Sequence, residues 1–294
     1  MSAPEPVGPV VTGFDGSPSA EDALVLARAW ARVLGTGLVV ATVHPSPAPI
    51  SSGRVDAEWV ADRHHEAEKV LEGAHGLLAA VDAVDYRVVA SSSAAHGLHD
   101  LAEELGASVI VVGSSSAAAE RRLFAGSTAD RLLAGSQAPV GVAPAGFRDR
   151  NISVLERIGV AFVDTPDGHA ALDLAVRLAV RVSATLTLYS VLAGEAELVM
   201  PVIGRDAEHA FAATAQDRFQ RALDLALAGI PAGVPAGARI LTGNVVDVLA
   251  ELDEVDVLFC GSRGYGPARR VLLGGVSSRL VRRARSPIVV VPRG

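Results

Sequence analysis

Short apolar segments alternate along this chain with longer segments whose apolar residues recur at helical spacing. In the first half the apolar segments are uninterrupted, which is typical of strands buried on both faces of a parallel sheet. They span residues 8–14, 38–44, 85–91, 108–113 and 139–144. The intervening segments predict helices at Ala20–Leu34, Val55–Ala79, His99–Leu105 and Ala129–Leu133. Ser17 and Pro18 are expected to begin the first helix as its N-cap and first residue.

The second half of the chain repeats the first at an offset of 148 residues, which places Gly113 on Gly261. Strands are expected there at 157–164, 185–191, 238–243, 255–261 and 287–292. The sequence thus predicts an α/β fold of two repeated doubly wound domains, each a five-stranded, mostly parallel sheet with helices on both faces. We expect domain 1 to span residues 1–146 and domain 2 residues 152–294, joined by a polar linker.

Composition narrows the class of protein. Half of the 294 residues are apolar, enough for a packed core, and no apolar stretch approaches the length of a membrane span. A net charge of −7 argues against bulk binding to nucleic acid or anionic membranes. The N-terminus also lacks the features of a secretory signal, so we expect a cytoplasmic protein. The single cysteine, Cys260, lies in an apolar strand and is expected to be a buried hydrophobe rather than a reactive thiol.

Several kinds of catalytic chemistry find no support. Lys69 is the only lysine and does not follow a glycine, which excludes a Walker A loop and disfavours Schiff-base chemistry. His64, His65 and Glu68 share a helical face, but without a further cluster they favour a solvated surface over a metal site. No G-x-S-x-G nucleophile elbow is present. The sequence therefore assigns no catalytic residue and no metal ligand.

A glycine-rich segment, "GSRGYGPARRVLLGGVSS", follows the fourth strand of the second domain. In doubly wound sheets, ligands bind beyond the carboxyl ends of the strands, where strand order reverses. Gly261 and Gly264 can leave backbone amides unobstructed, and Gly274 precedes a helix N-terminus that would attract phosphate. Arg263 could add a charge-assisted hydrogen bond. The segment is therefore either an anion site or a flexible loop with scattered charges.

The order of strand, glycine segment, helix and "SPIVVV" resembles the C-terminal half of a universal stress protein domain. ATP-binding members of that family carry G-x2-G-x9-G followed by Ser or Thr, and Gly261, Gly264 and Gly274 match these glycines. Asp15 and Asp164 match the aspartate that commonly ends the family's first strand. Because the resemblance covers both repeats, it implies a tandem universal stress protein that binds ATP, with or without Mg²⁺.

Carried over position by position, the resemblance implies a nucleotide site in each domain. Asp164 is then expected near the ribose or phosphates, the backbone of Val191 near adenine, and the glycine segment along the ribose and phosphates. The implied residues of domain 2 are Asp164, Val191, Gly261, Arg263, Gly264, Gly274, Gly275, Val276 and Ser277. Those of domain 1 are Gly13, Asp15, Val43, Gly113, Ser116, Gly126 and Ser127.

Both domains depart from the family's pattern. In domain 2, Gly275 replaces the expected hydroxyl residue, although Ser277 follows two positions later. In domain 1, Ser116 replaces the second glycine and Ser115 stands where Arg263 stands, while Ser127 keeps the hydroxyl. The change in domain 1 restricts the backbone and removes a charge, so we expect domain 2 to be the better site.

The resemblance implies a regulatory stress-response protein, not an enzyme, whose bound adenine nucleotide modulates its interaction with an unknown regulatory protein partner. Two alternatives stay open: a slow ATPase or nucleotidyl-transfer enzyme, and an apo scaffold that binds no nucleotide. The last strands, 139–143 and 287–291, are apolar sheet edges, and we expect them to pair as an intramolecular pseudo-dimer of the two domains. A homodimer of whole chains is open as well.

Overall fold

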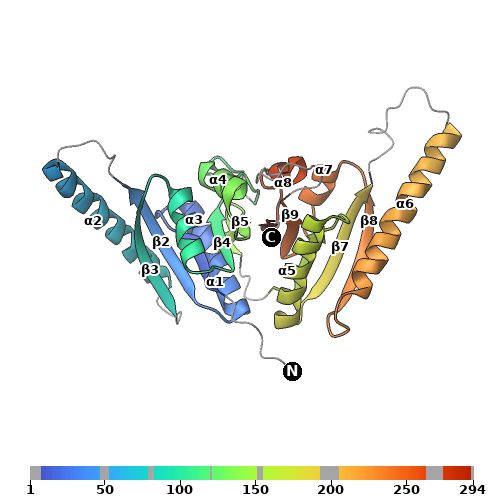
Figure 1. Ribbon diagram of the computed structural model, residues 1–294, viewed down its shortest axis with the longest axis horizontal. Helices are drawn as coiled ribbons and strands as arrows, with labels where there is room; N and C mark the ends of the chain where they lie inside the picture. The colour runs from blue at the N-terminus through green and yellow to red at the C-terminus, as the bar shows by residue number, and fades with distance from the viewer. Residues whose placement is uncertain are drawn as a thin grey trace. The chain divides into compact units, whose positions relative to one another are not determined.

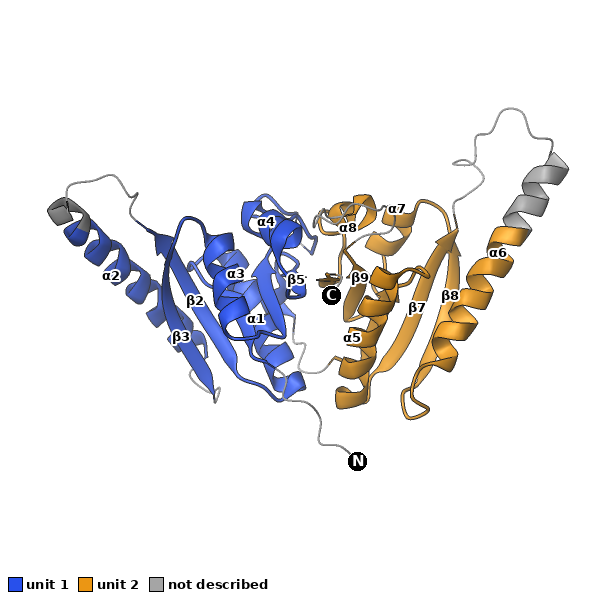
Figure 2. Cartoon of the chain, in the orientation of Figure 1, with its two compact units in different colours: residues 1–153 blue, residues 154–294 orange. Residues whose placement is uncertain are grey.

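The computed structural model describes residues 8–46, 53–78, 83–119, 121–150, 155–192, 205–262 and 274–292. The chain divides into two compact units, Met1–Ser153 and Val154–Gly294, which are coloured separately in Figure 2. In each unit, strands and helices alternate along the chain (Figure 1). Within the described residues, no helix is both long enough and apolar enough to cross a membrane.

The first unit is built around a parallel sheet. Its described strands are β1 (Val10–Gly13), β2 (Leu38–Pro45), β3 (Val84–Ser91), β4 (Val109–Gly113) and β5 (Val140–Ala143). They lie in the order β3-β2-β1-β4-β5, and each pairing between them is parallel. The helices are α1 (Pro18–Leu34), α2 (Gly53–Leu77), α3 (Ala94–Glu104) and α4 (Ser127–Gly135). Right-handed crossovers place α1 and α2 on one face of the sheet and α3 and α4 on the other.

The second unit repeats this arrangement. Its described strands are β6 (Arg157–Ala161), β7 (Thr185–Leu192), β8 (Ala236–Thr242), β9 (Val257–Gly261) and β10 (Ile288–Val291), in the parallel order β10-β9-β6-β7-β8. The helices are α5 (Pro166–Val182), α6 (Arg205–Ala228), α7 (Val245–Ala250) and α8 (Gly275–Leu280). The predicted fold class, two repeated doubly wound α/β domains, is confirmed.

The central strands explain why the apolar segments of the sequence are uninterrupted. Helices cover both faces of the sheet, so successive side chains are buried whichever face they point to. Val10 and Val11 of β1 and Val109 and Ile110 of β4 are all fully buried. Trp30 of α1, only 2% exposed, packs into the core on one side of this sheet.

The beginnings of the helices follow from capping side chains. As predicted, α1 begins at Pro18, and its N-cap Ser17 accepts a hydrogen bond from the Ala20 amide. The prediction for α3 is wrong at its start: the helix begins at Ala94 rather than at His99. Ser93 caps it there, because its hydroxyl accepts a hydrogen bond from the His96 amide.

Candidate functional site

Strand order reverses between β1 and β4. From β1 the chain builds the sheet outward through β2 and β3, then returns to place β4 on the other side of β1. A cavity of about 740 Å³ lies at the carboxyl ends of these two strands. Gly13 and Gly113, the last residues of β1 and β4, line it together with the first residues of α1 and α4. This is the position at which doubly wound sheets bind ligands.

All residues that the sequence implies for domain 1 line this cavity. They are Gly13, Asp15, Val43, Gly113, Ser116, Gly126 and Ser127. They come from the ends of three strands, the loop after β4 and the beginning of α4. The structure thus brings together, around one hollow, residues that are separated by more than a hundred positions in the sequence.

The backbone of Val43 is exposed to the cavity because β2 is longer than β1. The Ala41 carbonyl accepts a hydrogen bond from the Phe14 amide, so Ala41 directs its backbone polar groups toward β1. In a parallel strand this direction repeats at every second residue, and Val43 therefore points the same way. Since β1 ends at Gly13, no residue of β1 lies opposite Val43. Its amide and carbonyl can therefore form hydrogen bonds with a ligand that carries an acceptor and a donor along one edge.

The N-terminus of α4 has no side-chain cap, unlike the N-termini of α1 and α3 at the same cavity. The hydroxyl of Ser17 caps α1, and the hydroxyl of Ser93 caps α3. The N-cap of α4 is Gly126, which has no side chain to accept from the first-turn amides. Ser127 and the next two residues line the cavity. Unsatisfied amides and the helix dipole together favour an anionic group at this end of the cavity.

Gly113 has a packing function as well as a place in the cavity wall. A Cβ atom on this residue would overlap the carbonyl oxygen of Ser19 and lie 2.6 Å from its carbonyl carbon. Only glycine therefore allows the first turn of α1 to approach the end of β4. The corresponding contact in domain 2 is looser, since a Cβ on Gly261 would lie 2.7 Å from the carbonyl oxygen of Asp167.

The loop after β4 is closed by backbone hydrogen bonds. Ser114 and Ala125 form an antiparallel bridge, and the Ser115 amide donates to the Phe124 carbonyl at 2.7 Å. Ser115, Ser116 and Ala118 line the cavity from this loop. Their side chains are small and uncharged, so the loop residues that line the cavity bring no positive charge to it.

In domain 2 the structure describes part of the implied site. Arg263 and Gly264 lie outside the described residues. Val191 repeats the geometry of Val43: the Phe162 amide donates to Tyr189, two residues before Val191, and β6 ends at Ala161. Asp164 is exposed and its carboxylate lies 2.9 Å from Nε2 of His169, whereas Asp15 accepts a hydrogen bond from the Ser17 amide at 3.0 Å.

The residues after the glycine segment of domain 2 surround the start of α8. Gly274 is its N-cap, has no side-chain cap, and donates its amide to the Ser262 carbonyl at 2.6 Å. Gly275 has open space around its Cα, and Val276 follows it in the first turn of the helix. Ser277 is buried, and its hydroxyl donates to the Gly261 carbonyl at 2.7 Å. That hydroxyl is therefore already hydrogen-bonded to β9, so the backbone of this turn is the part placed to bind a ligand.

Two residues at the domain 1 cavity, Asp22 and Arg148, are not implied by the family's motif. Both line the cavity. Asp22 lies on the buried face of α1, where the repeat has Ala170 in domain 2. A carboxylate on the buried face of a helix is the signal that could have identified it, because an ionised group there needs hydrogen-bonding partners.

Cys260 of β9 is a buried hydrophobe, as predicted. It is 4% exposed, and burial raises the pKa of its thiol to about 12, an effect partly opposed by a hydrogen bond with Ser277. The native thiol therefore stays protonated and unreactive at neutral pH.

This burial predicts a pH dependence of stability. The thiol of the unfolded chain ionises near its ordinary pKa of about 8.5, whereas the native thiol keeps its proton, so raising the pH favours unfolding. Between about pH 8 and pH 9.5 the loss from this group should be about 1 kcal/mol. Urea unfolding followed by circular dichroism at both pH values measures it, and Cys260→Ala should remove that part of the loss. An identical pH dependence in the variant would contradict this prediction.

The sequence matches the model described as the universal stress protein family over residues 7–144 and 155–292. The chain belongs to the universal stress protein family. The two matched ranges correspond to the two repeats, so the resemblance to tandem members of the family is confirmed. Universal stress proteins are generally regulatory proteins, and the curated relatives of this chain carry no enzymatic name.

Relatives similar in sequence support this assignment, and a solved structure shares the fold. Universal stress proteins of Mycobacterium tuberculosis and Mycobacterium bovis are 30% identical to this chain over 302 residues, which cover 96% of it and 99% of theirs. The crystal structure of a universal stress protein from Archaeoglobus fulgidus shares the fold, with a TM-score of 0.65 and 20% identity over 98% of this chain and 97% of its own. A universal stress protein solved in complex with cAMP matches 48% of this chain and 99% of its own, with 20% identity and a TM-score of 0.35.

Proposed function

We propose that this universal stress protein is a regulatory stress-response protein that binds ATP at the strand-order reversal of its domains. Occupancy by the nucleotide would modulate its interaction with a protein partner. The observation that carries the proposal is that all seven implied residues of domain 1 converge on one cavity. Its volume of about 740 Å³ lies within the range of about 300–1,000 Å³ that is common for small-molecule sites.

The two ends of the domain 1 cavity suit the two ends of ATP. The backbone amide and carbonyl of Val43 form a donor–acceptor pair that matches the edge of an adenine base. The uncapped first turn of α4, with the hydroxyl of Ser127, suits the phosphates. Asp15 lies at the end of β1, near the expected ribose or phosphates.

Within the described residues, no cluster of three or more His, Cys, Asp or Glu could hold a metal ion. Mg²⁺ would arrive bound to the phosphates of ATP and keep several water ligands, with at most one or two carboxylates added by the protein.

In domain 2 we propose the corresponding site. The backbone of Val191 supports it, because it points past the end of β6 as Val43 points past β1. The uncapped start of α8 at Gly274 supports it as well. Asp164, Gly261, Gly275, Val276 and Ser277 complete the described part of the proposal, and Arg263 and Gly264 enter it from the sequence alone.

The nucleotide that copurifies with the chain tests this function. Mass analysis of small molecules released from the heat-denatured, full-length protein should find ATP or a related adenine nucleotide. Absence of any nucleotide, together with no uptake of added ATP, would favour the apo scaffold. Phosphate release measured over hours with bound ATP separates a regulatory binder from the enzymatic alternative, since steady turnover would favour a slow ATPase.

A bulky substitution at the start of α4 is expected to weaken ATP binding to domain 1. Gly126 has φ −83° and ψ 179°, which any residue can adopt, and a Cβ there would lie an ordinary 3.5 Å from Ser115. Gly126→Leu should therefore fold, yet place a bulky side chain beside the free amides and lower ATP affinity at least about tenfold. Equilibrium titration with ATP measures the effect.

Gly135, at the other end of α4, supplies the matched control. A Cβ added to it would meet no atom within 4 Å apart from its chain neighbours and its own helix backbone, and it does not line the cavity. Gly135→Leu makes the same change in the same helix and should leave ATP affinity unaltered. Equal affinities for both variants would argue against phosphate binding at the start of α4.

The pairing of the two last strands, the homodimer, the protein partner and the cytoplasmic location stay predictions from the sequence. A protein partner belongs to the proposed function because a regulatory protein acts through the molecules that it binds. Size-exclusion chromatography with light scattering, performed with and without ATP, tests the oligomeric state.

A further inference from the structure

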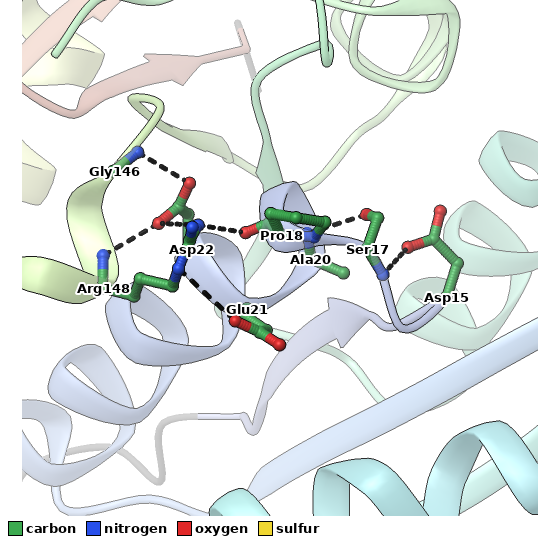
Figure 3. A network of polar contacts seen from close by, with 8 residues as sticks. All are labelled: Asp15, Ser17, Pro18, Ala20, Glu21, Asp22, Gly146 and Arg148. Atoms are coloured by element: carbon green, nitrogen blue, oxygen red, sulfur yellow. Dashed lines mark hydrogen bonds and ion pairs between the residues drawn. The ribbon is translucent and has the colours of Figure 1, made fainter. Parts of the chain in front are cut away.

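The segment that follows β5 lies against α1 and closes one side of the domain 1 cavity. Gly146 and the 3₁₀ turn Phe147–Asp149 form this segment, and Phe147 is fully buried. The carboxylate of Asp22, 2% exposed, accepts hydrogen bonds from the amides of Gly146 at 2.9 Å and Arg148 at 2.8 Å (Figure 3). Residues expected to be a polar linker are therefore bound to the first domain by a buried carboxylate.

The guanidinium of Arg148 is held in place by α1. Its Nη1 donates to the Pro18 carbonyl at 2.9 Å and to the Asp22 carboxylate at 3.2 Å, and its Nε lies 3.4 Å from a carboxylate oxygen of Glu21 (Figure 3). Its Nη2 forms no hydrogen bond with the described residues. A guanidinium presents five donors in a fixed plane, so the donors of Nη2 are available to a further acceptor.

Among the described residues that line the cavity, Arg148 is the one with a basic side chain, whereas Asp15, Asp22 and Asp149 are acidic. The loop after β4, which carries Arg263 in the domain 2 repeat, has Ser115 at that position. A polyphosphate entering this cavity would thus find one positive side chain, and it comes from the segment after β5.

We propose that Arg148 recognises the phosphate chain of the nucleotide in domain 1, in place of an arginine at position 115 of the loop after β4. This inference rests on the proposed function, which it deepens by assigning the residue that distinguishes nucleotides by their phosphates. Asp22 is the positioning residue: its carboxylate fixes both the backbone of the segment and the guanidinium. The device belongs to domain 1, because Ala170 stands at the corresponding position of domain 2 and cannot hold such a segment.

Arg148→Gln tests the proposal in the full-length chain. The hydrogen bonds from Gly146 and Arg148 to Asp22 come from backbone amides, so this variant keeps the segment in place. Photolabelling with 2-azido-ATP, followed by peptide mapping, measures labelling of each domain separately. Competition with ATP or with adenosine then gives the affinity of each domain for each of these two competitors. Arg87→Gln is the control, since Arg87 is an exposed domain 1 arginine that does not line the cavity.

Loss of one charge-assisted hydrogen bond should weaken ATP competition in domain 1 about ten- to hundredfold. Adenosine competition in domain 1 and all labelling of domain 2 should be unchanged. Arg148→Lys should recover part of the ATP affinity, because it restores the charge without the planar donors. Arg87→Gln should behave as wild type.

Two results would overturn the inference, and they are distinguishable. If Arg148→Gln leaves ATP competition unchanged, or weakens ATP and adenosine equally, Arg148 is only a structural clamp while the proposed function stands. If ATP does not compete for labelling of domain 1 in the wild-type chain, the proposed function fails for that domain and the inference fails with it.

Discussion

Gly113→Ala is expected to lower the free energy of unfolding of domain 1 by about 3 kcal/mol. The added Cβ would overlap the Ser19 carbonyl, and backbone atoms at the start of α1 cannot move aside as a flexible side chain could. The first turn of α1 would have to shift away from β4, disturbing the packing of both elements. Urea unfolding followed by tryptophan fluorescence measures this domain alone, since both tryptophans, Trp30 and Trp59, lie in it.

Gly141 of β5 provides the comparison for this prediction. A Cβ on that glycine would lie at an ordinary 3.6 Å from the side chain of Val111, so Gly141→Ala should change the unfolding free energy by less than about 1 kcal/mol. A Gly113→Ala protein as stable as Gly141→Ala would show that the approach of α1 to β4 does not require glycine. The first motif glycine would then have its explanation in ligand binding alone.

Gly264→Val is expected to weaken ATP binding to domain 2 by a few powers of ten. The branched side chain would penalise a left-handed backbone and stand where the backbone is expected to approach phosphate. Losing two or three charge-assisted contacts of about 1.5–3 kcal/mol each gives a reduction of that size. Calorimetric titration with ATP measures both the affinity and the number of sites.

Ser116→Val is the matched change in domain 1 and should matter less. Ser116 is exposed on a loop that is closed by its own backbone hydrogen bonds, and it already lacks the freedom of glycine. Loss of binding in Ser116→Val together with normal binding in Gly264→Val would reverse the ranking of the two sites. No change in either variant would mean that both segments are loops without a role in binding.

The fold could be predicted from the sequence because two of its signals are local and repeated. Uninterrupted apolar segments identify the central strands, which are buried on both faces, and the 148-residue offset repeats each of them. The edge strands β3 and β8 are instead half-buried or exposed along most of their length. The start of α3 could not be placed in this way, since it depends on the hydroxyl of Ser93 rather than on hydrophobic spacing. Capping by a serine in a serine-rich stretch gives no unique position.

The cavity in domain 1 could be anticipated only in part. The resemblance to the family implies Gly13, Gly113 and Gly126, which the structure brings together. The resemblance does not imply Arg148, because that residue is held at the cavity by a contact with Asp22, 126 positions away in the sequence. The segment around Arg148 has the polar composition of a linker, and the burial of Phe147 and the hydrogen bonds to Asp22 show that it packs on domain 1. Long-range contacts of this kind leave no periodic pattern in a sequence.

The central claim, that ATP binds at the strand-order reversal of these domains, is tested most directly by calorimetric titration of the full-length chain. Wild type is compared with the double variant Gly126→Leu/Gly264→Val, which alters the implied phosphate end of both sites. We expect saturable binding of ATP to wild type and a reduction of at least tenfold at each site in the double variant. Absence of saturable binding to wild type, or equally tight binding to the double variant, would contradict the claim.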